Sequence, residues 1–341
     1  MRQPSVSVVM PVYNAAKFIH KSLDSLLNQT LQNIEIICVN DGSTDDSLAI
    51  LKDYASRDAR IKIIDKPNSG YGHTINRGIE AASGEYIGNL DPDDFTDIGM
   101  YEKLYHTAKE YDADVVKSNY YAYRSKNGES IFFEVLSGLP YNQITSADEN
   151  ERIFHRQPCI WSAIYKKELL INNHIFLNET PGASYQDTAF AFKVWVNAKK
   201  VVFIKDAFVH YRTDNESSSV HDSDKVFYVC DEFNSIQSYL NQDEKLRNKF
   251  SKILQVLKYD TYVWNLNRIS DTYKEVFRDQ IALEFIKAEY DGLLDKAYFD
   301  EGRWNGVQKY IHDYHSAHIS ANNGRTLLKI AMKKLKHKIL G

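Results

Sequence analysis

The amino-acid sequence predicts an α/β fold, with a mostly parallel sheet flanked by helices and followed by a helical C-terminal region. Over about the first hundred residues, short apolar segments alternate with segments of helical periodicity, which is typical of a parallel sheet covered on both faces. After about residue 226 this alternation stops and long helical stretches follow. We therefore expect one domain at residues 1–225 and a helical region at residues 226–341.

The strands of the first domain are predicted from short apolar runs that end at proline, glycine, asparagine or aspartate. They lie at Val6–Met10, Ile34–Val39, Ile61–Ile64 and Tyr86–Leu90. Three segments between them have helical periodicity, namely Ala15–Leu27, a helix capped by Thr44 or Asp45 that runs to Tyr54, and His73–Ala82. In a sheet of this kind, ligands bind outside the carboxyl ends of the strands.

The remainder of the chain is predicted to be mixed up to residue 225 and helical beyond it. The expected strands are Val115–Val116, Ile131–Phe133 and Val201–Ile204, and the expected helices are Glu168–Asn172, Ala189–Ala198, Val226–Leu240 and Phe250–Leu266. No internal repeat or Gly/Ser linker interrupts this pattern.

Composition excludes several classes of protein. The chain has 341 residues, of which 43% are hydrophobic and 26% charged, and this balance favours a folded core over disorder. The net charge of −4 disfavours nucleic-acid binding through bulk charge. Three widely spaced cysteines argue against a disulfide scaffold or a zinc site. Because the sequence has no signal-peptide core and no apolar run of membrane-spanning length, we expect a cytoplasmic protein.

A lysine-rich amphipathic segment lies close to the C-terminus. Between residues 326 and 340, Leu328, Ala331, Met332, Leu335 and Ile339 fall on one helical face with lysines around it. This pattern predicts an interfacial helix that contacts an anionic membrane surface from the cytoplasmic side. The alternative is a basic helix that docks on the acidic remainder of the chain.

Polar residues gather where the predicted strands of the first domain end. They are Tyr13, Asn14, Asn40, Asp41, Asn68, Asp91, Asp93 and Asp94. Since the carboxyl ends of parallel strands meet at one edge of a sheet, we expect these side chains to converge on one ligand site.

The segment Asp91-Pro92-Asp93-Asp94 has the strongest chemical signal of this group. Three carboxylates within four residues repel one another unless a cation or a hydrogen-bond donor neutralises them. Carboxylate oxygens suit Mn²⁺ or Mg²⁺, which also bind substrate phosphates. A turn followed by a helix N-cap is the structural alternative. The buried strand before it and the three neighbouring polar strand ends favour a metal site.

Several spaced motifs make the sequence similar to family 2 glycosyltransferases with the GT-A fold. The motifs are Val6–Asn14, Ser22–Thr30, Val39–Ser47, Asn68–Gly70, Ala82–Ile87 and Leu90–Asp94. The resemblance is dense over residues 4–100 and thins out to about residue 215. It implies transfer of a sugar from a nucleotide donor, usually a UDP-sugar, with inversion at the anomeric carbon.

The resemblance also implies roles for residues on the donor side. Pro11, Tyr13, Asn40, Asp41, Asn68, Gly70, Arg77, Asp91 and Arg212 are the expected donor-binding residues. Tyr13 would stack on uracil, and the Asn40-Asp41 pair would contact the uracil imide and the ribose. The family often has aspartate where this chain has Asn40, but an amide oxygen can still accept the imide hydrogen. Arg77 and Arg212 are candidates for the diphosphate, although Arg77 also suits a surface position.

For the metal, the resemblance implies Asp93 as a ligand of Mn²⁺ or Mg²⁺, with Asp91 beside it. His210 is a third candidate, for which a structural role is the alternative. The ion would bridge the donor diphosphate and neutralise charge as the nucleotide leaves.

For the chemistry, the segment Gly182–Phe190 resembles the family's Glu-Asp segment at the start of a helix, with Gln186 in the glutamate position. Asp187 would then be the general base that takes the proton of the acceptor hydroxyl. From the residues alone, a carboxylate that interacts with the helix dipole is the alternative.

Together these features predict an inverting transferase that moves a hexose or N-acetylhexosamine from a UDP-sugar to a saccharide or lipid-linked saccharide in cell-surface polysaccharide synthesis. A non-catalytic nucleotide-sugar or carbohydrate-binding protein on the same fold is the first alternative, and a nucleotidyltransferase is the second. The sugar and the acceptor depend on pocket shape, which the sequence does not reveal.

Overall fold

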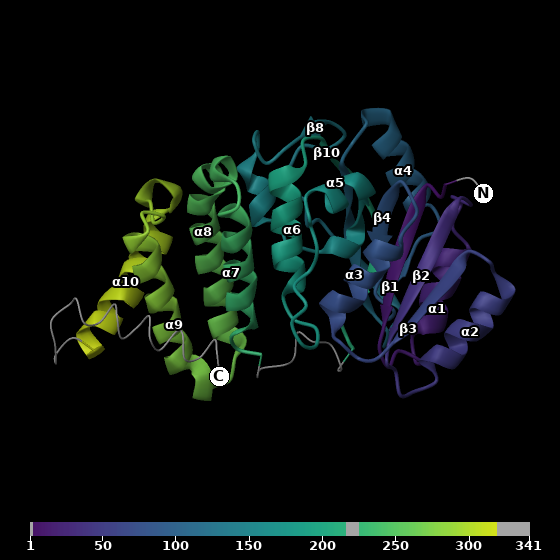
Figure 1. Cartoon of the computed structure of the whole chain (residues 1–341), viewed down its shortest axis with the longest axis horizontal. Coiled ribbons are helices and arrows are strands. Elements are labelled where there is room, and N and C mark those ends of the chain that lie inside the picture. The colour runs from purple at the N-terminus through teal and green to yellow at the C-terminus, as the bar shows by residue number, and fades with distance from the viewer. Residues whose placement is uncertain (1–2, 216–224, 319–341) are drawn as a thin grey trace. The chain divides into compact units, whose positions relative to one another are not determined.

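The computed structural model describes residues 3–215 and 225–318, and its contacts divide the chain into two units, Met1–His221 and Asp222–Gly341. Figure 1 labels their helices and several strands of the first unit. The amphipathic segment expected at residues 326–340 lies outside the described residues.

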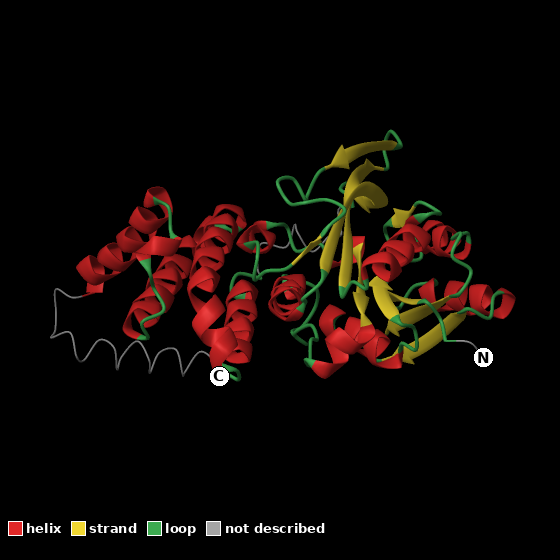
Figure 2. Cartoon of the chain, turned by 90° about the horizontal axis from the view of Figure 1, so that it is seen from above, coloured by secondary structure: helices red, strands yellow, loops and turns green. Residues whose placement is uncertain are grey.

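Within the described residues, the first unit has a ten-stranded mixed sheet, coloured yellow in Figure 2. Its strands are β1 (Val6–Val12), β2 (Ile34–Asp41), β3 (Ile61–Lys66), β4 (Tyr86–Asn89), β5 (Phe95–Thr96), β6 (Val115–Arg124), β7 (Glu129–Phe133), β8 (Ile144–Thr145), β9 (Ala163–Lys166) and β10 (Val201–Arg212). The order is β3-β2-β1-β4-β9-β6-β10-β5, with β7 paired to β6 and β8 to β10. The first four strands are parallel, and β6 is parallel to β10. This arrangement confirms the predicted fold class.

The helices of the first unit connect these strands. They are α1 (Ile19–Leu27), α2 (Ser47–Arg57), α3 (Tyr71–Ala81), α4 (Met100–Tyr111), α5 (Lys167–Asn172) and α6 (Gln186–Asn197), with short 3₁₀ segments at Glu151–His155 and Ile160–Ser162. The chain moves from β1 outward to β3 through α1 and α2 and returns to β4 through α3. Right-handed crossovers therefore put α3 on the opposite face of the sheet from α1 and α2, as Figure 1 shows.

Several helix starts differ from those predicted, since α6 begins at Gln186 instead of Ala189 and, in the second unit, α8 (Glu244–Arg268) begins at Glu244 instead of Phe250. Helix α1 begins at Ile19 instead of Ala15, because Asn14 has a left-handed backbone (φ 48°) and the N–H groups of Ala15 and Ala16 donate to Ser47 and Asp45. Helix α3 begins at Tyr71 instead of His73. The later start of α1 lengthens the loop after β1, and the earlier start of α3 shortens the loop after β3.

Strand register brings the polar strand ends to one edge, as predicted. Val12 at the end of β1 lies opposite Asn40 of β2, and Asn40 lies opposite Asp65 of β3. On the other side of β1, Val9 lies opposite Asn89, the last residue of β4. The segments that follow these strands therefore leave the sheet side by side.

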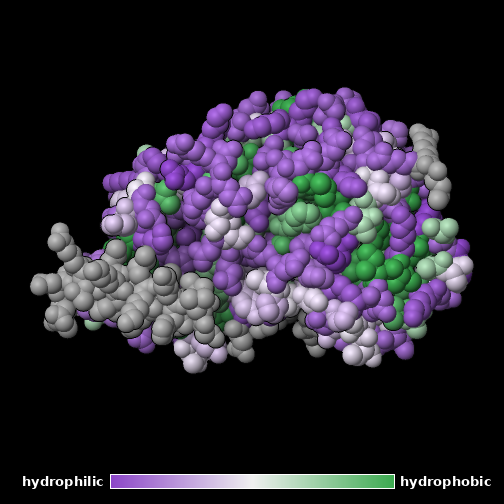
Figure 3. All heavy atoms as spheres, in the orientation of Figure 1, coloured by the Kyte–Doolittle hydropathy of each residue, from purple (hydrophilic) through white to green (hydrophobic). Residues whose placement is uncertain are grey.

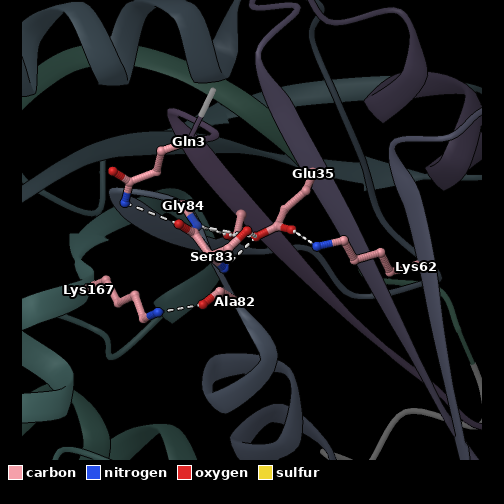
Figure 4. A network of polar contacts seen from close by, with 8 residues as sticks. Gln3, Glu35, Lys62, Ala82, Ser83, Gly84 and Lys167 are labelled. Carbon is pink, nitrogen blue, oxygen red and sulfur yellow. Dashed lines mark hydrogen bonds and ion pairs between the residues drawn. The ribbon is translucent and has the colours of Figure 1, made fainter. Parts of the chain in front are cut away.

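At the amino-terminal edge, a buried polar network joins the strands (Figure 4). The Glu35 carboxylate of β2 accepts hydrogen bonds from Ser7, from the Ser83 hydroxyl at 2.8 Å and from the Gly84 amide at 3.2 Å, and it pairs with Lys62. Burial raises the pKa of Glu35, but the bonds from Lys62, Ser7 and Ser83 outweigh it and lower the pKa to about 2. The ionised carboxylate therefore stabilises this edge.

Replacing Glu35 by Gln is expected to lower the free energy of unfolding by about 2–3 kcal/mol at neutral pH. The depressed pKa means that this contribution is present above the unfolded pKa of about 4.5 and is lost as the pH falls towards 2. Denaturant unfolding at pH 7 and pH 3 measures it. The exposed Glu110→Gln variant is the control, and an equal difference between E35Q and wild type at both pH values would contradict this account.

The described part of the second unit consists of helices. They are α7 (Tyr228–Leu240), α8 (Glu244–Arg268), α9 (Asp271–Tyr290) and α10 (Glu301–His318), with a 3₁₀ turn at Lys296–Tyr298. Phe233, Tyr262, Phe277 and Phe285 form an aromatic core. Within it, Lys258 and Tyr262 each lie 2.8 Å from the buried Glu284 carboxylate, so this charge is paired.

The surface carries few large apolar side chains. Figure 3 shows hydrophilic residues over most of one face, with apolar residues in patches between them. Among the described helices, none combines the length and the hydropathy needed to cross a lipid bilayer.

Candidate active site

The carboxylate turn after β4 is held in one conformation by surrounding residues. The Asp94 amide donates to the Asp91 carbonyl at 3.1 Å and closes the turn. The Arg212 amide donates to Asp94 Oδ1 and its Nε donates to the Asp93 carbonyl, both at 2.7 Å, while the Ser22 hydroxyl donates to the Asp94 carbonyl. Asp94 is buried, whereas Asp91 and Asp93 are partly exposed. The latter two carboxylates are therefore the ones that a ligand can reach.

Electrostatics in this turn favour a bound cation. Burial raises the pKa of Asp91 to about 7, and the neighbouring Asp93 adds to the effect. Burial, Asp93 and Asp91 likewise raise the pKa of Asp94 far above its usual range. A divalent cation would relieve this repulsion, and carboxylate oxygens are suitable ligands for Mn²⁺ or Mg²⁺.

The protein itself supplies few ligands to such a metal site. Among residues 3–215 and 225–318, no group of three or more His, Cys, Asp and Glu side chains is arranged to hold a metal ion. Asp91 and Asp93 can supply two ligands, and phosphate oxygens and water would complete the shell, as is usual for Mg²⁺. One Asp93 oxygen accepts a hydrogen bond from Asn215 at 2.8 Å, which orients it.

His210, the third metal candidate, is engaged elsewhere. Its Nε2 lies 3.1 Å from Asp97 and its Nδ1 lies 2.7 Å from the Ser130 hydroxyl. The ring stacks between Phe95 and Tyr121, at centroid distances of 4.4 and 4.9 Å. Both ring nitrogens therefore have partners other than the carboxylate turn, and a structural role accounts for this residue.

Arg212 was expected to bind the diphosphate, but its side chain contacts other residues of the protein. It is buried, and its guanidinium lies over the rings of Phe18 and Tyr123 and donates to Ser125 as well as to the Asp93 carbonyl. It therefore fixes the carboxylate turn. Arg77, the other diphosphate candidate, pairs at 2.6 Å with Glu80 on the exposed side of α3.

Tyr13 is exposed among the residues expected to bind the nucleotide. Its side chain is 53% exposed directly after β1, so its ring is available for stacking, whereas Pro11 is buried within β1. Asn40 is buried and its amide donates to Asp65 at 2.7 Å. That bond points the amide group of Asn40 towards β3.

Asp41 shapes the loop that carries Asn68 and Gly70. Its carboxylate accepts hydrogen bonds from the amides of Ser69 at 2.8 Å and Gly70 at 3.0 Å, and it pairs with Lys66. Gly70 has a φ of 91°, which favours glycine, and it is the residue before α3. The bonds made by Asp41 therefore fix the start of α3, while Asn68 stays exposed.

Asp187 lies in the first turn of α6, as its motif suggested. The helix is preceded by Tyr185 in a left-handed conformation (φ 63°), and Gln186 donates to the Thr180 hydroxyl at 2.8 Å. This hydrogen bond of Gln186 therefore stabilises the loop before α6. Burial raises the pKa of Asp187 to about 7, which is suited to a base that works near neutral pH.

Tyr71, at the start of α3, connects the carboxylate turn with Asp187. Its hydroxyl donates to Asp91 at 3.2 Å, and its amide donates to the carbonyl of Gly182, in the loop before Asp187. Burial raises the pKa of Tyr71 well above its usual range, and Asp91 and Asp187 both add to the effect. Tyr71 therefore connects the carboxylate turn with the loop before Asp187, and both carboxylates act on its pKa. The sequence did not single out Tyr71, although its position between two glycines was a signal.

Gly72 sets how closely α3 approaches this loop. A Cβ atom added at Gly72 would overlap the carbonyl of Asn178. We expect Gly72→Ala to lower the free energy of unfolding by about 2 kcal/mol, because backbone must move. Gly99, at the start of α4, has a φ of −94° and open space around it. Chemical denaturation of Gly72→Ala beside Gly99→Ala tests the packing, and equal stability of the two would refute it.

The chain is similar in sequence to known glycosyltransferases. The family model described as glycosyl transferase family 2 matches residues 7–170. Glycosyltransferase GlyG of Streptococcus pneumoniae is 36% identical over 215 residues, which cover 61% of this chain and 70% of GlyG. The uncharacterised glycosyltransferase EpsJ of Bacillus subtilis is 34% identical over 220 residues, which cover 63% of this chain and 62% of EpsJ.

Solved structures show the same fold. The TarS 1–349 structure of S. aureus in complex with UDP has a TM-score of 0.68 at 21% identity, over 93% of this chain and 90% of that one. The TarS 1–349 complex with UDP-GlcNAc has a TM-score of 0.57 at 20% identity, over 83% and 87% of the two chains. The fold is thus of the GT-A-like class that the resemblance implied. The similarity to GlyG and the family model show that the chain belongs to glycosyl transferase family 2.

Proposed function

We propose that the protein is an inverting glycosyltransferase that moves a hexose or N-acetylhexosamine from a UDP-sugar to a saccharide acceptor in cell-surface polysaccharide synthesis. The observation that carries the proposal is the junction at Tyr71, whose hydroxyl donates to Asp91 of the carboxylate turn and whose amide donates to Gly182 in the loop before Asp187. Sugar transfer from an activated donor requires one group of residues that binds the donor and another that accepts the proton of the acceptor hydroxyl.

On the donor side, Asp93 and Asp91 would hold Mn²⁺ or Mg²⁺. When bound, the ion supplies positive charge to the diphosphate, so that the nucleoside diphosphate is a better leaving group. Arg212 keeps the turn in place through its bond to the Asp93 carbonyl. Tyr13 would stack on the base, and the UDP and UDP-GlcNAc named with the TarS structures support a UDP-sugar as the donor.

On the acceptor side, Asp187 would take the proton of the attacking hydroxyl. The acceptor oxygen forms a bond to the anomeric carbon while the bond from that carbon to the diphosphate oxygen breaks, and the electron pair leaves with the UDP. A single displacement of this kind inverts the anomeric centre. The lysine-rich segment at residues 326–340 would suit an acceptor that is lipid-linked at a membrane surface.

A panel of nucleotide sugars tests this proposal with the purified full chain. We expect one UDP-sugar to raise the melting temperature in the presence of Mn²⁺ and to release UDP slowly by hydrolysis, and EDTA to abolish the release. Stabilisation without release, even when candidate saccharide acceptors are added, would favour a non-catalytic binding protein. Stabilisation by no nucleotide sugar, with or without metal, would refute the proposal.

A further inference from the structure

Asn76 is a buried amide in the middle of helix α3, where its side chain is 3% exposed. Asparagine is a weak helix former, because its side chain competes with the backbone for hydrogen bonds. A contact outside the helix therefore has to offset this cost. The partner of Asn76 lies 101 residues further along the chain, in the loop at residues 173–185 that connects α5 with α6.

The carboxamide of Asn76 binds both polar groups of the Leu177 backbone. The Leu177 amide donates to Asn76 Oδ1 at 2.9 Å, and Asn76 Nδ2 donates to the Leu177 carbonyl at 2.9 Å. The same Nδ2 lies 3.0 Å from the carboxylate of Glu179. A carboxamide has a donor and an acceptor side by side, and this pairing uses both. Asn76 therefore holds the backbone of the loop against α3 at Leu177, which is itself buried.

Further contacts hold the remainder of the loop between this point and α6. The amide of Tyr71, at the start of α3, donates to the Gly182 carbonyl at 3.0 Å. The Gln186 amide group donates to the Thr180 hydroxyl at 2.8 Å. Gln186 directly precedes Asp187, so a series of hydrogen bonds runs from α3 through the loop to the residue before the proposed base.

Helix α3 also contacts the donor side of the site. The Gly70 amide, just before the helix, donates to Asp41 at 3.0 Å, and the Tyr71 hydroxyl donates to Asp91 at 3.2 Å. One helix thus supports both the carboxylate turn and the loop before α6. Because a displacement of reacting groups by about 1 Å can lower a rate by about 10²-fold, the contacts that join this loop to α3 matter for the chemistry.

We propose that Asn76 is a positioning residue for the transfer reaction, because its carboxamide fastens the loop before α6 to α3 and so sets where Asp187 lies relative to the Asp91 turn. This inference rests on the proposed function, since it gives Asn76 a role in turnover only if Asp187 is the base.

Turnover by Asn76→Ala tests this role, with the UDP-sugar that the panel of nucleotide sugars identifies. The variant lacks both bonds to Leu177, so kcat is expected to fall by about 10–100-fold. The affinity for UDP is expected to stay within about threefold of the wild type, because the contacts of α3 with Asp41 and Asp91 do not involve Asn76. Steady-state UDP release and calorimetric UDP titration measure the two effects, at a temperature at which thermal unfolding shows the variant to be folded.

Asn119 on β6 supplies the matched control, since its buried carboxamide also binds the backbone of distant segments. The Leu136 amide donates to Asn119 Oδ1 at 3.0 Å, and Asn119 Nδ2 donates to the Lys205 carbonyl at 2.9 Å. Neither partner belongs to α3 or to the loop before α6. Asn119→Ala is therefore expected to lose thermal stability and to keep the kcat of the wild type.

A double variant separates an action on Asp187 from a general loosening of the site. In the Asp187→Asn background, Asn76→Ala is expected to change the remaining kcat by less than about twofold, because the group that Asn76 positions is already absent. Equal fractional losses in both backgrounds would overturn the inference. A folded Asn76→Ala protein with the kcat of the wild type would overturn it as well.

If Asn76→Ala does not fold, Asn76→Asp takes its place, since it keeps the shape of the side chain and can still accept from the Leu177 amide. Absence of UDP release by the wild type, or a wild-type kcat in Asp187→Asn, would instead count against the proposed function and thereby remove the basis of this inference.

Discussion

Replacement of Asp187 by Asn is expected to lower kcat by about 10³-fold, because the variant keeps the shape of the side chain but cannot accept the acceptor proton. The donor site is formed by other segments, so UDP affinity is expected to stay within about twofold of the wild type. The rise of kcat with pH through about 7 should also disappear, since Asp187 is the group assigned to it. Steady-state UDP release and calorimetric UDP titration measure the two effects.

The matched control for this variant is Asp206→Asn. Asp206 is an exposed aspartate on β10, so its loss is expected to leave both kcat and UDP binding unchanged. Activity of Asp187→Asn close to that of the wild type would mean that another group accepts the proton. Loss of UDP affinity in parallel with kcat would mean that Asp187 belongs to the donor site.

Replacement of Asp93 by Ala is expected to lower kcat/KM for the UDP-sugar by about 10²–10³-fold and to remove its dependence on Mn²⁺. The turn itself should persist, because Arg212 binds the Asp93 backbone carbonyl and the Asp94 carboxylate, not the Asp93 side chain. Turnover against Mn²⁺ concentration, with thermal unfolding to verify the fold, measures this.

Asp53→Ala, on the exposed side of α2, is the control for removal of a carboxylate. It is expected to behave as the wild type at every Mn²⁺ concentration. An Asp93→Ala protein that still responds to Mn²⁺ with the same half-saturation would show that the ion is held elsewhere. In that case the raised pKa of Asp91 would reflect burial without a metal role.

The parallel strands β1 to β4 could be predicted from sequence, because each buried strand is a short and nearly continuous apolar run. Continuous apolar runs before Pro11, Asn40 and Asp91 locate the strands, and the carboxyl ends of β1 and β2 lie one residue further on, at Val12 and Asp41. The edge at which these ends meet follows from topology alone. Family resemblance added Asp187, whose surrounding sequence by itself indicates only the start of a helix.

Contacts between distant segments could not be predicted in this way. The bond from Tyr71 to Asp91 depends on how α3 meets the carboxylate turn, and the loop before Asp187 approaches α3 closely only because Gly72 has no side chain. Arg212 illustrates the same limit, since its motif suggested a diphosphate ligand but its bonds go to Asp93 and Ser125. Periodicity describes one segment at a time and carries no information about such pairs.

The most direct test of the account is a calorimetric titration of the full chain with UDP, performed with Mn²⁺ and again with EDTA. If the carboxylates of the Asp91 turn hold an ion that also binds the diphosphate, UDP should bind at least about tenfold more tightly with Mn²⁺ than with EDTA. Equal affinity in both conditions, or no binding in either, would contradict a metal-dependent UDP-sugar site at the Asp91 turn.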